Sequence, residues 1–198
     1  MKNMTLQELY DYLNSPEFQD VKSGNIFYNY YIYQYSAAKE YEMQRQIVGF
    51  KRNLERPNSF VNAMLLDLFQ VFCDYLKAEK FGPDSLFDVT LEDDKVQSDM
   101  VTQELTTEAN SDNFIHYVHD RIDEHLKIND GLNKPYIFIH GVGKMFPYLR
   151  TNVFLHVMKN TMTRRDTKLS FSIPGIRKET LFPCSIRLKM RIHIVQPY

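Results

Sequence analysis

Apolar residues recur every three to four positions in several stretches of the chain, the spacing of an amphipathic helix. The clearest case is residues 37–54, whose predicted buried stripe is Met43, Ile47, Phe50 and Leu54. Residues 5–14 begin with Thr5 and have Glu8 three positions later, a pair typical of a helix N-terminus. Further helices are predicted over residues 67–80, 112–128 and about 147–161.

These later helices carry more detailed predictions. The expected buried face of residues 67–80 is Phe69, Phe72, Cys73 and Leu76. Residues 112–128 are expected to be capped by Ser111 or Asp112. Pro147 is placed in the first turn of the last helix, where proline is tolerated.

Shorter stretches are predicted to be strands: residues 26–35, 59–66, 135–140, 168–173 and 185–195. Residues 135–140 are continuously apolar, which is typical of a strand buried on both faces. Pro174-Gly175 is expected to end the predicted strand at residues 168–173. Residues 185–195 alternate strictly, and their basic outer face is a candidate functional surface formed by Arg187, Lys189 and Arg191.

Residues 88–111 are acidic, rich in Thr and Ser, and only weakly periodic. Two interpretations stay open for them, a poorly specified segment and a peripheral helix. Elsewhere strands and helices alternate, a pattern typical of α/β proteins. We therefore predict a single α/β domain over residues 1–198. Its expected architecture is three-layer, a mostly parallel sheet with helices on both faces, Rossmann-like or P-loop-like but without a phosphate loop.

Composition limits where the protein can reside. No apolar run reaches the roughly 18–20 residues needed to span a bilayer, and the N-terminal sequence lacks the apolar core of a signal peptide. A cytoplasmic location without membrane contact is therefore expected. The two cysteines, Cys73 and Cys184, match no zinc or disulfide pattern.

The net charge of −1 hides an uneven distribution of charge along the chain. Residues 144–198 contain eleven Lys and Arg but two acids, whereas residues 1–143 contain 13 basic and 23 acidic residues. This division favours either a basic surface that faces something anionic, or two oppositely charged parts that neutralise each other within the fold. Both interpretations stay open.

The turn after residues 135–140 is the strongest candidate for chemistry. Open α/β sheets bind ligands at the carboxyl ends of their strands, and backbone N–H groups at a helix N-terminus favour anions. Gly141 and Gly143 are expected to turn the chain with positive φ, and Lys144 adds charge. With His140 before them and Arg150 after them, they form a candidate functional rim.

The spacing within this turn matches no nucleotide-binding motif. A phosphate loop has the form G-x-x-x-x-G-K-[ST], whereas here one residue separates the glycines and Met145 follows Lys144. Phe146 stands where the dinucleotide fingerprint has its third glycine, and Pro147 lacks an N–H donor. We favour a packed structural turn, and a ligand-binding turn is the alternative.

Signals for catalysis or metal binding are weaker elsewhere. His116 and His119 lie one helical turn apart, but no third metal ligand is indicated, so a solvated polar face is favoured. The sequence contains no nucleophile elbow, zinc-protease motif or Cys–His arrangement. We therefore predict no catalytic residues, no metal and no cofactor, and a protein that is not an enzyme.

The run IFIHGVGKMFPYLRTNVFLHVM, at residues 137–158, resembles the BrxB family. In that family an apolar strand is followed by G-V-G, an apolar residue, an aromatic residue, a proline and then an arginine. The matching positions here are Gly141, Val142, Gly143, Phe146, Pro147 and Arg150. The aromatic stretch that begins at Phe27 and the FSIPG run that ends at Gly175 also resemble the family pattern. His140 and the segment after Gly175 depart from it, so the chain resembles a diverged member.

The BrxB family belongs to bacterial BREX phage-resistance systems. The resemblance therefore implies a non-catalytic accessory or adaptor protein in phage defence. It implies association with the PglZ-type component, with a BrxC-type ATPase as a second candidate partner and nucleic acid reached only indirectly. The alternative function is a small-ligand- or nucleotide-binding α/β domain that uses the rim at residues 140–150.

Overall fold

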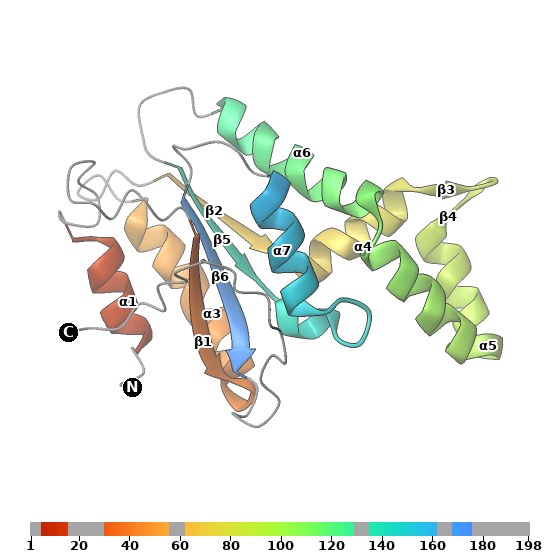
Figure 1. Ribbon diagram of the computed structural model, residues 1–198, viewed down its shortest axis with the longest axis horizontal. Coiled ribbons are helices and arrows are strands. Elements are labelled where there is room, and N and C mark those ends of the chain that lie inside the picture. The colour runs from red at the N-terminus through yellow and green to blue at the C-terminus, as the bar shows by residue number, and fades with distance from the viewer. Residues whose placement is uncertain (1–4, 16–29, 56–61, 129–134, 162–167, 176–198) are drawn as a thin grey trace. The chain divides into compact units, whose positions relative to one another are not determined.

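The computed structural model describes residues 5–15, 30–55, 62–128, 135–161 and 168–175 (Figure 1). These residues cluster into two units. The first unit contains the described residues up to position 65 together with 135–140 and 168–175, and the second contains 66–128 and 141–161. The expected single domain over residues 1–198 stays a prediction.

A sheet forms the centre of the first unit. Its strands are β1 (Tyr30–Ser36), β2 (Asn62–Asp67), β5 (Pro135–His140) and β6 (Lys168–Gly175), in the order β1-β6-β5-β2. Strand β6 pairs in parallel with both β1 and β5. Parallel pairing needs long crossover connections, which the helices between these strands supply. The predicted α/β class with parallel strands is thus supported by these two pairings.

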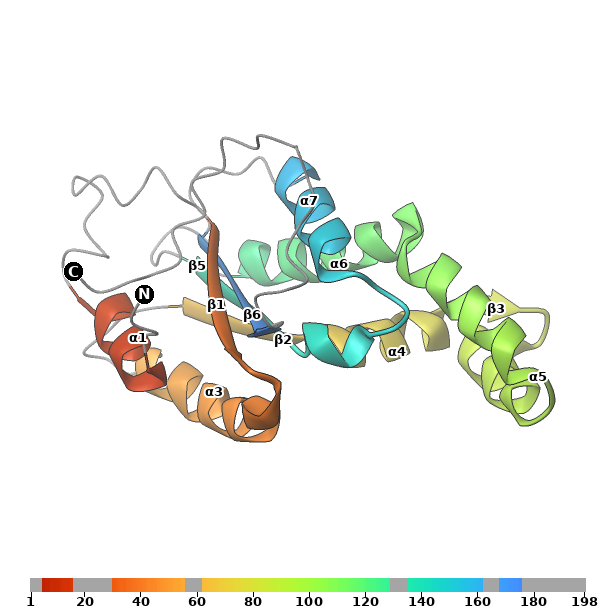
Figure 2. The same ribbon diagram turned by 60° about the horizontal axis from the view of Figure 1, so that its bottom comes forward.

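Two helices of the first unit lie on the same side of this sheet (Figure 2). Helix α1 (Leu6–Leu13) begins with the predicted capping box, in which the Thr5 hydroxyl accepts from the Glu8 N–H and the Glu8 carboxylate accepts from the Thr5 N–H. Helix α3 (Glu40–Leu54) follows the short 3-10 helix η2 (Ala37–Lys39). The predicted apolar stripe of α3 is buried at all four positions.

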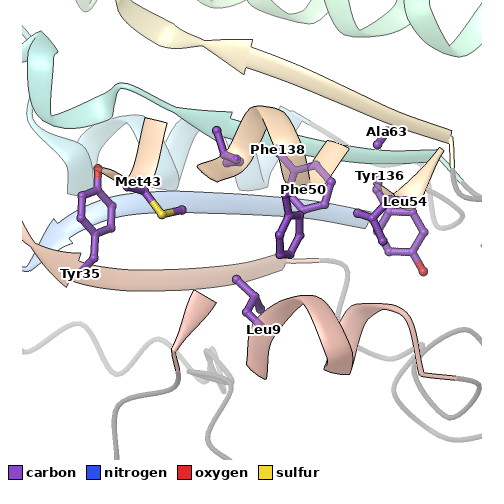
Figure 3. Close-up of a cluster of buried hydrophobic side chains, with 9 residues drawn as sticks. Leu9, Tyr35, Met43, Phe50, Leu54, Ala63, Tyr136 and Phe138 are labelled. Carbon is purple, nitrogen blue, oxygen red and sulfur yellow. The ribbon is translucent and has the colours of Figure 1, made fainter. Parts of the chain in front are cut away.

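Aromatic contacts join these helices to the sheet (Figure 3). The Phe50 ring of α3 meets Tyr10 of α1 edge to face, with centroids 5.1 Å apart, and Phe138 of β5 in the same geometry at 5.8 Å. Such T-shaped pairs add to the stability gained from apolar burial. The buried cluster consists of Leu9, Tyr35, Met43, Ile47, Phe50, Leu54, Ala63, Tyr136 and Phe138. Alternate residues Ile137 and Ile139 are fully buried as well, which confirms that β5 is buried on both faces.

Helices dominate the second unit. They are α4 (Leu68–Ala78), α5 (Leu86–Ala109), α6 (Asp112–Ile128), the 3-10 helix η3 (Val142–Met145) and α7 (Thr151–Thr161). Between α4 and α5, the two-residue strands β3 (Lys80–Phe81) and β4 (Asp84–Ser85) form an antiparallel hairpin. Helix α4 packs against both α5 and α6. The Ser111 hydroxyl accepts from the Phe114 N–H at 3.1 Å, so Ser111 is the cap of α6.

The core of the second unit is aromatic. Phe114 of α6 contacts Phe72 and Tyr75 of α4, with ring centroids 5.0 and 5.4 Å away. The Tyr75 hydroxyl donates to a Glu108 carboxylate oxygen at 2.8 Å, which joins α4 to the end of α5. Burial, and then the hydrogen bond to Glu108, raise the pKa of Tyr75 to about 12. Tyr75 therefore stays protonated and keeps this hydrogen bond through the physiological pH range.

The three-layer, Rossmann-like arrangement that the sequence favoured is wrong for the described residues. After β2 and α4 the chain does not return to the sheet with another strand, but continues into α5 and α6. These helices pack on α4 and on each other. Of the two interpretations of residues 88–111, the peripheral helix is confirmed as α5.

Three local predictions are also corrected. Phe69 is 36% exposed, because Asp67 caps α4 and the buried face of that helix is Leu68, Val71, Phe72, Tyr75 and Leu76. Pro147 lies in a turn before α7, because residues 142–145 already form η3. Strand β6 runs through Pro174 to Gly175. Pro174 pairs with Tyr35 of β1 and lies beyond the register of β6 with β5, which reaches Phe171, and proline is tolerated where a strand has one neighbour.

Candidate functional site

Gly141 connects β5 to η3 in the left-handed conformation, with φ of 71° and ψ of 8°. Residues with a Cβ avoid this region. A Cβ at position 141 would also lie 2.3 Å from Asp67 Oδ1, which is closer than any real contact. Both backbone conformation and space therefore require glycine here. Gly143, by contrast, lies within η3, and of the described glycines only Gly82 and Gly141 have positive φ, so the expectation for Gly143 is wrong.

The turn is built around Asp67, which the sequence analysis did not identify. Asp67 ends β2 and caps α4, where its Oδ1 accepts from the N–H groups of Phe69 at 3.1 Å and Gln70 at 3.4 Å. Its Oδ2 accepts from Lys144 Nζ at 2.8 Å. An aspartate before an apolar-periodic stretch is a recognisable N-cap signal. The ion pair with a lysine 77 positions away has no such local signal.

These contacts engage the Lys144 ammonium and the N-terminal N–H groups of α4, two kinds of group that could bind an anion near this turn. The Lys144 and Asp67 side chains are 33% and 26% exposed, and the carboxylate neutralises the ammonium group. Asp67 also takes the first free N–H groups of α4, the positions where a helix N-terminus binds phosphate or carboxylate. A bound anion would have to displace Asp67 from both. The geometry therefore favours the packed structural turn.

The other rim residues have different surroundings. His140 is buried at the end of β5 and belongs to the first unit, whereas the four remaining rim residues belong to the second. Arg150 has an exposed side chain, and its carbonyl accepts from the N–H groups of Val153 and Phe154 at the start of α7. The structure thus brings Gly141 and Lys144 together at Asp67 but leaves Arg150 at the surface. The candidate basic surface of Arg187, Lys189 and Arg191 lies outside the described residues.

Two further titratable groups of the second unit, Cys73 and His119, have shifted pKa values. Burial raises the pKa of the Cys73 thiol, so the unreactive protonated form is favoured at neutral pH. Burial, and then the neighbouring His116, lower the pKa of His119. Over the described residues, no cluster of three or more His, Cys, Asp or Glu side chains could hold a metal ion. No helix in this part of the chain is long and apolar enough to cross a membrane.

A family model described as BREX protein BrxB matches residues 64–184. This match covers more than half of the chain. The chain belongs to the BrxB family. No curated protein and no solved structure gives a significant match.

BrxB membership makes the chain a component of a BREX phage-defence system. It confirms the resemblance that rested mainly on residues 137–158. The matched region begins within β2 and contains Asp67, Gly141 and Lys144. The packed turn around Asp67 therefore lies within the region that the family model matches.

Proposed function

We propose that this BrxB protein is a non-catalytic adaptor in its BREX system, which binds the PglZ-type component. A BrxC-type ATPase is the second partner that we propose. The adaptor acts in the cytoplasm and reaches nucleic acid only through these partners. In this proposal the protein holds other BREX components together. Its membership of the BrxB family supports the presence of such partners in the same system.

One observation carries the non-catalytic part of the proposal. Lys144 and Gly141, which most strongly suggested a ligand site at the turn, are both engaged with Asp67. A ligand at this place would use the Lys144 ammonium and the N–H groups of a nearby helix N-terminus, and Asp67 already pairs with Lys144 and caps α4. Because these groups stabilise the fold, we propose that the protein works by binding partner proteins at its surface.

Affinity purification from a host that carries the complete BREX gene cluster tests this proposal. The tagged protein is expected to recover the PglZ-type component at a level that survives washing. A tagged, unrelated protein of similar size and charge serves as the control. Recovery of no BREX component above this control would overturn the adaptor function.

A thermal-shift series addresses the ligand-binding alternative directly. Nucleotides and phosphorylated metabolites at millimolar concentration are expected to leave the melting temperature unchanged. A ligand that binds the native state must raise it, by an amount that grows with the ratio of concentration to Kd. A reproducible increase that disappears in Lys144→Met would favour the alternative.

A further inference from the structure

Helix α5 is a bent arm rather than one straight helix. Gln97 has non-helical dihedral angles, φ −139° and ψ 54°, and separates two helical halves. The first half begins where the Leu86 N–H donates to the Glu79 carbonyl at 2.9 Å, and the second ends where Glu108 accepts from Tyr75. The residues that hold the two halves, Glu79 and Tyr75, both lie at the C-terminal end of α4. The chain therefore leaves α4, reverses near Gln97 and returns to it (Figures 1 and 2).

The outer end of this arm is entirely exposed. All ten residues from 91 to 100, here called the arm tip, are solvent-exposed, whereas Val101 and Ala109 in the returning half are buried. The tip nevertheless contains apolar side chains with large exposed fractions: Leu91 at 51%, Val96 at 80% and Met100 at 55%. These side chains add nothing to the apolar core of the unit.

The arm tip is also acidic. Its charged residues are Glu92, Asp93, Asp94, Lys95 and Asp99. The single cation, Lys95, pairs with Glu92 at 2.7 Å. Three carboxylates, those of Asp93, Asp94 and Asp99, therefore set the charge around the exposed apolar groups. Such a surface attracts a basic partner and repels nucleic acid and anionic membranes, whose phosphates carry the same sign.

We infer that the arm tip is a docking surface for a protein partner whose own surface is basic around an apolar recess. This inference rests on the proposed adaptor function and names the surface that performs it. Val96 and Met100 enter the recess, and the carboxylates of Asp93 and Asp94 meet Lys or Arg at its margin. Apolar anchors contribute most of the affinity in such interfaces, whereas marginal charges mainly raise the association rate.

Binding measurements with the purified PglZ-type component test the inference. The variants are Val96→Ala/Met100→Ala, which truncates the apolar groups, and Asp93→Lys/Asp94→Lys, which reverses the local charge. The matched control is Tyr41→Ala/Val48→Ala on α3, where the side chains are 74% and 43% exposed. Circular dichroism and melting temperature verify that each variant is folded.

The apolar variant is expected to bind about tenfold more weakly or worse, as for truncation of interface anchors. The charge-reversed variant is expected to associate more slowly, with the largest difference from the unchanged protein at low salt. The Kd of the control variant should stay within about twofold of that of the unchanged protein, a change too small to identify an interface anchor.

The outcomes separate the inference from the proposed function. If the unchanged protein binds no BREX component, the adaptor function itself fails. If it binds and both tip variants bind equally well, the adaptor function stands and the arm tip is not its docking surface. A self-association of the unchanged protein that the tip variants abolish would assign the tip to a second copy of this chain, and would overturn the inference.

Discussion

The turn around Asp67 and the arm tip are both rich in polar groups, but they use them in opposite ways. At the turn, a carboxylate, an ammonium and two backbone N–H groups satisfy one another within a partly buried cluster. At the arm tip, four carboxylates and three apolar side chains face solvent, and only one of the carboxylates, that of Glu92, pairs with a cation. The turn resembles a ligand site in sequence, but its geometry favours a structural role, whereas the acidic tip resembles a featureless segment and exposes apolar side chains to solvent.

This difference has a physical origin. Parallel strands bring their carboxyl ends to one edge, and the polar groups gathered there must be paired because the edge is partly buried. Asp67 provides that pairing for β2, α4 and the chain after β5 at once. A helical arm that projects into water has no such requirement. Its composition is limited by solubility and, under the docking proposed here, by the surface of the partner.

Gly141→Ala should produce the largest loss of stability. The new Cβ would be held in a left-handed conformation and would contact Asp67 at 2.3 Å, so that Asp67 must move away from α4 and Lys144. We expect a loss of about 2–4 kcal/mol in the free energy of unfolding, from strain together with the lost cap. Urea denaturation measures it.

Gly49→Ala is the matched control for this substitution. Gly49 lies within α3, and a Cβ there meets nothing within 4 Å. Alanine should therefore stabilise the protein by about 0.5–1 kcal/mol, the usual gain over glycine in a helix. Equal behaviour of the two variants would contradict the close approach of Gly141 to Asp67.

Asp67→Ala should have the second-largest effect. It removes the cap of α4 and leaves Lys144 without its carboxylate, at a cost of about 1–2 kcal/mol. Asp67→Asn retains a capping oxygen but loses the charge, so the free energy of unfolding should fall by about 0.5 kcal/mol. The difference in the free energy of unfolding between Asp67→Asn and the unchanged protein should become smaller as salt is added, because salt screens the ion pair with Lys144. A salt-independent difference would mean that the pair contributes through packing.

Tyr75→Phe removes one hydrogen bond and leaves the aromatic core of the second unit in place. The loss should be about 1 kcal/mol or less, because Glu108 is partly exposed and can bind water instead. Tyr41→Phe, at a position that is 74% exposed, should have no measurable effect. A similar loss in both variants would show that the bond from Tyr75 to Glu108 is not a link between α4 and α5.

Local sequence patterns allowed much of the fold to be predicted. The α3 stripe, the Thr5 capping box and the doubly buried β5 each depend on neighbours within a few positions. The arrangement of layers was not predictable, because the weakly periodic residues 88–111 form a helix that packs on α4 through tertiary contacts.

The candidate site was predicted only in part, for a similar reason. Gly141 and Lys144 were identified from local sequence, but their common partner Asp67 lies 77 positions before Lys144. Without that contact Lys144 had to be treated as a free cation. Phe69 was assigned to the core because periodicity does not fix the position of a short apolar stripe to within one residue, and the cap at Asp67 determines it.

His119 should give a small dependence of stability on pH. Burial lowers its pKa in the folded state, so the unfolded chain binds the proton more tightly. The stabilisation is therefore present above the unfolded value of 6.5 and is lost as pH falls below it, through the folded pKa. His116 opposes protonation, whereas Asp123 and Asp120 favour it. His119→Asn should flatten this part of the pH profile in thermal denaturation, and an unchanged profile would assign the dependence to other groups.

Val96→Ala/Met100→Ala at the arm tip should have the smallest effect on stability. Both side chains are more than half exposed, and alanine favours the helix, so the free energy of unfolding should change by no more than about 0.5 kcal/mol. Urea denaturation of the same variant that is used for binding measures it. A loss above about 1 kcal/mol would show that these side chains support the fold, as Asp67 does. An unchanged stability with weakened partner binding would separate the two regions completely, since truncation at the tip would then act on association alone.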